Sequence, residues 1–128
     1  MTSVLNVDTI AAKNGTSPVA LTKQSAAKVY SLWDMADLSG TGGTTGIDTS
    51  FNVSSMDDDG AGDFGINFTN SFSSVNYTAT SATSGGARRV LTRSGTVTAS
   101  AMDGLTRNDS NANSDASGCS VAIHGDLA

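Results

Sequence analysis

Residues 50–68, SFNVSSMDDDGAGDFGINF, carry two runs of alternating apolar and polar residues, separated by an acidic, glycine-containing connection. The apolar positions are Phe51 and Val53 before the connection and Phe64, Ile66 and Phe68 after it. Because successive side chains of a β-strand point to opposite faces, this period of two predicts a hairpin with one buried face. Asp and Gly suit a tight turn, so we expect the carboxylates of residues 57–63 at a hydrated hairpin tip.

Further β-prone runs extend this pattern along the chain, at 29–35, 75–81, 88–93, 96–100 and 119–126. The run 29–35 also permits the end of a short helix, but a strand is favoured because everything after it is β-prone. About seven short strands with frequent turns predict an all-β fold, an antiparallel β-sandwich. Its predicted core is Phe51, Val53, Phe64, Ile66, Phe68, Val75, Tyr77, Val121 and Ile123.

The chain divides into three predicted parts: an N-terminal arm at 1–23, a linker with one strand and a Gly-rich loop at 24–50, and the sandwich body at 51–128. The arm is a strand, a turn and a second strand, with the apolar residues Val4, Leu5, Val7, Ile10, Val19 and Leu21. Two such short strands cannot fold alone. We therefore predict an attachment and oligomerisation arm, with folding back onto its own sandwich as the alternative.

Large apolar residues are scarce, with aromatic residues at 5% of the chain. Such a core is thin for a monomer, and packing against identical copies would bury more area, so we expect a homotrimer. The net charge of −5 argues against nucleic-acid binding, which needs a basic surface. No apolar run approaches the roughly 18 residues of a membrane span, so we expect no membrane insertion.

Two acidic runs imitate the ligand spacing of a calcium loop, namely Asp57, Asp59 and Asp63 in the first and Asp109, Asn111, Asn113 and Asp115 in the second. A calcium loop needs a bidentate Glu at its twelfth position, where these runs have Phe68 and Ser120. We expect a hairpin tip and an exposed loop in place of metal sites, with bound calcium as the weaker alternative, and we expect no cofactor.

The candidates for catalysis are few. His124 is the single histidine, and Asp126 lies two residues further on, on the same face of a strand. Cys119 is the single cysteine and is expected to be a small buried residue. We therefore predict no enzymatic activity. A small hydrolase would need His124 and Asp126 at a pocket, and a carbohydrate-binding module would need Trp33 and Tyr77 exposed on one face.

The segments SVLNVDTIAAKNGTSPVALTKQSAAK, SFNVSSMDDDGAGDFGINFTNSFSSVNYTATSAT and SVAIHGD resemble short fibre-like structural proteins of marine tailed bacteriophages. The resemblance covers most of the chain as a pattern of β-strands. It implies a non-enzymatic virion protein, a trimeric tail-fibre-like appendage anchored by its N-terminal arm to other virion proteins. The chain is much shorter than long receptor-binding fibres, which leaves a head fibre or a capsid decoration open, as well as a contact with a host surface glycan.

Overall fold

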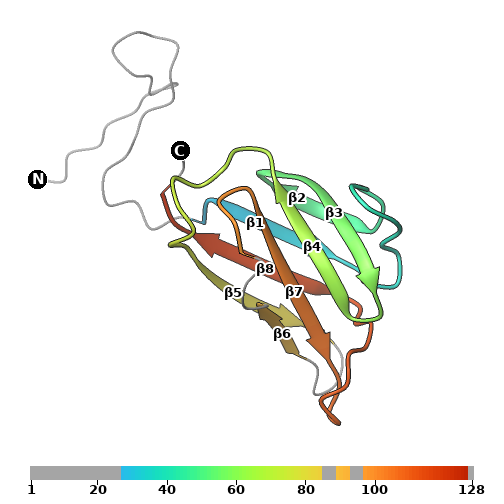
Figure 1. Cartoon of the computed structure of the whole chain (residues 1–128). Helices are drawn as coiled ribbons and strands as arrows, with labels where there is room; N and C mark the ends of the chain where they lie inside the picture. Colours follow the sequence, from blue (N-terminus) through green and yellow to red (C-terminus); the bar gives the residue numbers. More distant parts are fainter. Residues whose placement is uncertain (1–26, 85–88, 93–96, 127–128) are drawn as a thin grey trace, which may run out of the picture.

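The computed structural model describes residues 27–84, 89–92 and 97–126, and these form a sandwich of two antiparallel four-stranded sheets (Figure 1). The predicted fold class is confirmed. The strands are β1 (Val29–Trp33), β2 (Ile47–Phe51), β3 (Val53–Gly60), β4 (Asp63–Phe68), β5 (Thr78–Thr83), β6 (Arg89–Thr92), β7 (Ala101–Arg107) and β8 (Cys119–His124). The predicted arm residues lie outside the described part of the chain.

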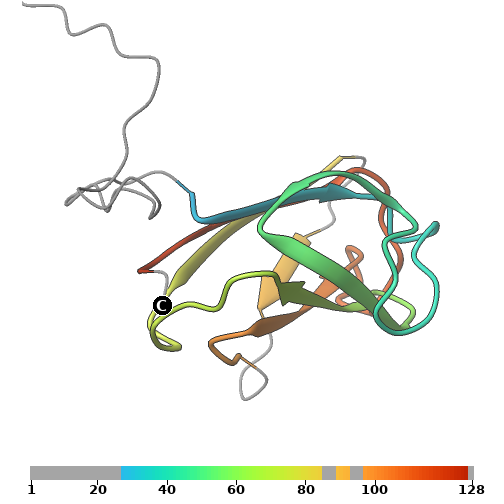
Figure 2. The same ribbon diagram turned by 90° about the horizontal axis from the view of Figure 1, so that it is seen from above.

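The strand order is β2-β1-β8-β5 in one sheet, called here the first sheet, and β3-β4-β7-β6 in the second sheet. Figure 2 shows the two layers from above, with β1 in one layer and β3 and β4 in the other. Residues 29–35 therefore begin with a strand and not a helix. β1 and all of β2 except Phe51 fall in the segment predicted as a linker, yet both are strands of the same sheet as β8.

The core fills the space between the sheets. Trp33 of β1 packs on Phe64 of β4, with ring centroids 5.0 Å apart, and both side chains are completely buried. The Trp33 indole Nε1 donates a hydrogen bond to the Met35 sulfur at 3.2 Å, so its one polar group is not left unpaired. Ile66 lies opposite Met56 and Met102 on the neighbouring strands, and all three are buried.

Most of the predicted core is confirmed. Phe64, Ile66, Phe68, Val121 and Ile123 are buried, and Val53 and Tyr77 are partly buried against the core. Phe51 and Val75 were predicted wrongly, because each is 52% exposed.

Phe51 is exposed because the chain passes from the first sheet to the second at Asn52. This residue has a left-handed backbone with φ of 59°, so Phe51 ends β2 in the first sheet while Val53 begins β3 in the second. The alternation of Phe51 with Val53 therefore does not continue along one strand. Val75 lies in the irregular connection before β5, and Phe72 of that connection is the buried residue.

The hairpin of β3 and β4 is present, but its strands continue through the acidic run. The turn is at Ala61 and Gly62, and Asp57 pairs with Gly65 within the ladder. The prediction that these carboxylates form a loop tip is therefore wrong for Asp57 and Asp58, which are half-buried in β3. Their carboxylates are accommodated there by hydrogen bonds, since Asp57 accepts from the Gly42 amide and Asp58 accepts from the Gly60 amide at 3.1 Å.

The Gly-rich loop predicted in the linker, at residues 39–46, pairs with the edge strand β3. Gly43 and Met56 exchange two backbone hydrogen bonds of 3.0 and 2.8 Å, and the Asp58 amide donates to the Gly40 carbonyl at 2.8 Å. An exposed strand edge invites pairing with other chains, and here the loop occupies part of it.

The strand predicted at 96–100 is wrong, since residues 97–100 form a turn and the strand is β7. Its inward residues are Met102, Gly104 and Thr106, and two of these are not apolar, so alternation could not reveal it.

Candidate interaction surface

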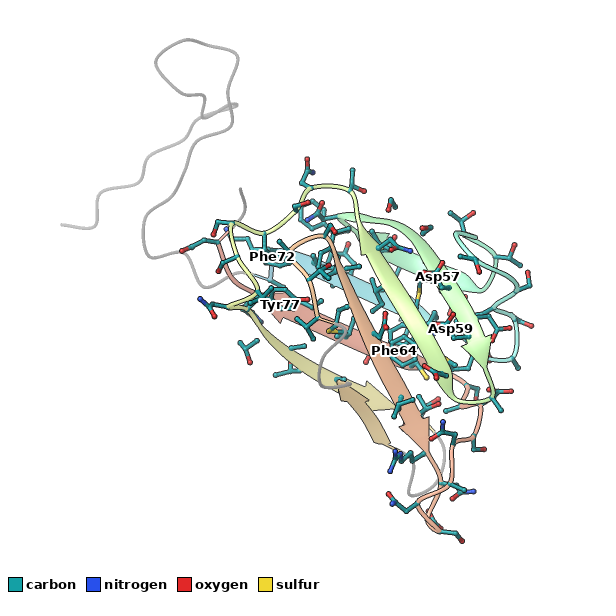
Figure 3. All side chains as sticks on the ribbon, viewed as in Figure 1. Asp57, Asp59, Phe64, Phe72 and Tyr77 are labelled. Atoms are coloured by element: carbon teal, nitrogen blue, oxygen red, sulfur yellow. The ribbon has the colours of Figure 1, made fainter. Side chains whose placement is uncertain are left out.

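The first acidic run is tied into the fold by hydrogen bonds. The Gly42 amide donates to one carboxylate oxygen of Asp57, and the Asn67 side-chain amide donates to the other at 3.0 Å. Figure 3 shows Asp57 and Asp59 along β3. Asp63 begins β4, beyond the turn. The Asp57 carboxylate therefore holds the Gly-rich loop against β3.

The second acidic run also accepts a hydrogen bond from the backbone of another loop. The Asp115 carboxylate accepts a hydrogen bond of 2.7 Å from the Gly62 amide, which joins this loop to the β3–β4 turn. Asn111 takes a left-handed backbone with φ of 62°, while Asp109 and Asn113 are exposed. Among residues 27–84, 89–92 and 97–126, no three His, Cys, Asp or Glu side chains come together in a way that could hold a metal ion.

The residues considered for catalysis belong to β8 and to the segment that follows it. His124 is half-buried at the end of β8, and Asp126 is exposed beyond it. Cys119 is fully buried, and its thiol donates to the Ala116 carbonyl at 3.2 Å. The expectation of a small buried cysteine is confirmed.

Tyr77 and Trp33 do not form an exposed platform. Trp33 is buried, and Tyr77 stacks on Phe72 with centroids 4.6 Å apart, at the end of the sandwich seen in Figure 3. The Tyr77 hydroxyl lies 3.0 Å from the carbonyl oxygens of both Thr98 and Ala101, and it can donate to either. Burial, together with the nearby charge of Asp103, raises the pKa of Tyr77 to about 12. Tyr77 therefore links the 97–100 turn to the core.

The outer face of the second sheet is charged, with three carboxylates and Arg107 of β7. Asp57 of β3 and Asp103 of β7 lie on either side of Gly65, so close that a Cβ added to Gly65 would be 3.0 and 3.3 Å from their carboxylate oxygens. Asp63 alternates outward on β4 from the buried Phe64. Three carboxylates thus occupy three neighbouring strands.

The outer face of the first sheet instead carries exposed apolar side chains. Tyr30 and Leu32 of β1 and Phe51 of β2 are exposed by 44%, 37% and 52%. The rings of Tyr30 and Phe51 stack with centroids 5.9 Å apart and planes 19° apart. These three residues form an apolar ridge on the solvent-facing side of the first sheet.

A groove runs beside this ridge, above β8, with a volume of about 400 Å³. We call it the β8 groove. Its floor is Ser120 and Ala122, with Tyr30 and Leu32 of β1 on one side and Thr80 and Ala82 of β5 on the other. Every residue that lines it, in the part of the chain that the structure describes, is uncharged. The β8 groove forms because Ser120 and Ala122 of β8 have small side chains, whereas Tyr30 and Leu32 of β1 have larger ones.

This surface was not predicted from the sequence, although the residues of β1 indicate it. The strand Val29–Trp33 has apolar side chains on both faces, since Val29 and Trp33 are buried while Tyr30 and Leu32 point outward. A strand with one face in water normally alternates apolar with polar residues. The strand departs from that pattern because its outer face is apolar as well.

The described residues contain no helix that is long and apolar enough to cross a membrane. No protein-family model, curated protein or solved structure matches the chain. The resemblance to short phage fibre proteins therefore stays a prediction.

Proposed function

We propose that this chain is a non-enzymatic structural protein of a virion, a short appendage in which three copies pack through the outer faces of their first sheets. The N-terminal arm anchors the appendage to other virion proteins. The second sheet and the polar loops face water. A head fibre and a capsid decoration are variants of the same role.

The contrast between the two outer faces carries this proposal. A large exposed apolar patch on a soluble domain marks a surface for association. Here the apolar ridge of Tyr30, Leu32 and Phe51 lies on one sheet, while Asp57, Asp63 and Asp103 lie on the other. With a net charge of −5 per chain, copies that met through the carboxylate-bearing second sheet would repel each other, so the apolar ridge and the uncharged groove beside it are the favoured contact.

A carbohydrate-binding module is the second candidate, and one observation favours it. Tyr30 borders the β8 groove, and an aromatic ring beside an uncharged hollow can pack against a sugar. However, the Thr80 hydroxyl donates to the Ala122 carbonyl at 3.3 Å, and the Ser120 hydroxyl donates to the Ala82 carbonyl at 3.4 Å. Both hydroxyls thereby use their donor within the sheet and could only accept a hydrogen bond from a sugar, so we favour a protein partner.

A charged substitution on the ridge tests the proposed contact. Leu32→Glu places a carboxylate in the apolar face, and we expect it to convert the trimer into monomers, because a charge buried without a partner costs several kcal/mol. Light scattering measures the molar mass, and the thermal transition verifies that the variant is folded. Ala61→Glu, in the exposed β3–β4 turn, adds the same charge elsewhere and should remain trimeric. A folded Leu32→Glu protein with the wild-type mass would contradict the proposal.

A further inference from the structure

We infer that the copies pack head to tail, so that the β2–β1 half of each first sheet contacts the β8–β5 half of the next copy. This inference rests on the proposed function, since it takes the trimer as given. It adds which residues meet, because Tyr30 and Leu32 of one copy then enter the β8 groove of its neighbour. A contact between two different surfaces closes into a ring of three when each copy is rotated by a third of a turn.

The outer face of the first sheet steps down in side-chain size from one edge to the other. Tyr30 pairs with Phe51 on one side and with Ala122 on the other. Thr80 of β5 pairs with Ala122 in turn. Residues directly opposite each other on neighbouring strands have their side chains on the same face. One row across the sheet therefore runs from two aromatic rings to an alanine and a threonine.

The neighbouring row repeats this step. Leu32 pairs with Thr49 of β2 on one side and with Ser120 of β8 on the other. Ala82 of β5 completes the row, opposite Ser120. The largest side chain is again on β1, and those on β8 and β5 are small. The apolar ridge and the β8 groove are thus the raised half and the hollowed half of one face.

A threefold axis parallel to the strands, at the midline between β1 and β8, turns these two halves toward each other. The rotation keeps each strand at its distance from the axis. Because strands are evenly spaced at about 4.8 Å, β1 then faces β8 of the next copy, and β2 faces its β5. Tyr30 of one copy faces Ala122 of the next, and Leu32 faces Ser120. At both levels a larger side chain meets a smaller one.

Charge and hydration favour a copy of this chain as the occupant of the groove. The residues of the two rows are uncharged, so they add no repulsion between chains that each carry a net charge of −5. The Thr80 and Ser120 hydroxyls donate to carbonyls of their own sheet at 3.3 and 3.4 Å. An apolar side chain can therefore cover them without leaving a donor unpaired.

Disulfide trapping in the full-length chain tests the head-to-tail packing. Thr49 and Ala82 are exposed at the two ends of one row, and the inferred packing brings Thr49 of one copy beside Ala82 of the next. Within one chain they are three strand spacings apart, roughly 14 Å, whereas a disulfide needs Cα atoms within about 7 Å. On oxidation, a chain with both Thr49→Cys and Ala82→Cys should therefore give a covalent trimer on a non-reducing gel.

Matched variants control for chance oxidation. A chain with Thr49→Cys and Ala61→Cys, the latter in the exposed β3–β4 turn, should give at least several-fold less covalent trimer. Thr49→Cys alone should run as a monomer, because the inferred packing keeps the Thr49 residues of different copies apart. The native Cys119 is completely buried and is present in every variant. Light scattering of the reduced proteins measures the mass of the assembly independently of any disulfide.

The outcomes separate the inference from the proposed function. A trimeric mass without the covalent trimer, or with covalent pairs from Thr49→Cys alone, overturns the head-to-tail packing and leaves the trimer intact. A dimeric mass, with covalent dimers from the chain carrying both Thr49→Cys and Ala82→Cys, indicates reciprocal packing about a twofold axis and overturns both. A folded protein with a monomeric mass also overturns both.

Discussion

The Ile66→Asp variant is expected to lose its cooperative folded state. Ile66 is completely buried in the middle of β4, between Met56 and Met102 on the neighbouring strands. A carboxylate there would be unpaired, at a cost of about 3–5 kcal/mol, with lost apolar burial in addition. Because a small domain is stable by about 5–15 kcal/mol in total, this single change removes most of the stability.

Two control variants make the result specific. Ile66→Val keeps the site apolar and should cost about 0.5–1.5 kcal/mol. Thr69→Asp adds the same charge three residues later, at an exposed position, and should change the stability by about 0.5 kcal/mol or less. Urea denaturation followed by circular dichroism measures all three. A soluble Ile66→Asp protein with a wild-type transition would show that the inward face of β4 is assigned wrongly.

Gly62→Ala is expected to have the second-largest effect. Gly62 is in the β3–β4 turn with a left-handed φ of 66°, a conformation that costs other residues about 1–2 kcal/mol. A Cβ at this position would also lie closer than 3.0 Å to the Ser114 nitrogen and the Thr106 oxygen. Forcing these backbone segments apart adds about 1–3 kcal/mol and disturbs the hydrogen bond from the Gly62 amide to Asp115.

Gly40→Ala is the matched control for this variant. Gly40 has nearly the same backbone, with φ of 69°, but a Cβ there would meet nothing within 4 Å. It should therefore lose only the conformational part, so its denaturation midpoint should lie clearly between those of the wild type and Gly62→Ala. Equal midpoints for the two alanine variants would contradict the tight contact between the β3–β4 turn and the 108–118 loop.

The sandwich was predictable because its most regular strands follow simple alternation. Phe64, Ile66 and Phe68 of β4 and Val121 and Ile123 of β8 are apolar at every second position and buried as expected. β7 was not predictable from alternation, because its buried face includes Gly104 and Thr106. The Thr106 hydroxyl donates to the Ser114 carbonyl at 2.7 Å, and that contact depends on a loop distant from any local pattern.

The interaction surface depends on pairing between strands that are far apart in sequence. Tyr30 and Phe51 become neighbours only when β1 pairs with β2, and the groove exists only because β8 separates β1 from β5. The exposed ridge could have been suspected from the apolar residues on both faces of 29–33. Asp57 and Asp115 accept hydrogen bonds from backbone amides of other loops. These contacts could not be predicted from the sequence, because the spacing of the carboxylates equally suggested calcium ligands.

The proposed function predicts that a phage encodes this chain, and quantitative mass spectrometry of purified particles of such a phage tests the central claim most directly. Particles separated from infected-cell lysate on a density gradient should contain the chain at a fixed copy number per particle. For a trimeric appendage, that number should be a multiple of three. A chain that is abundant in the lysate but absent from the purified particles would contradict a structural role in the virion.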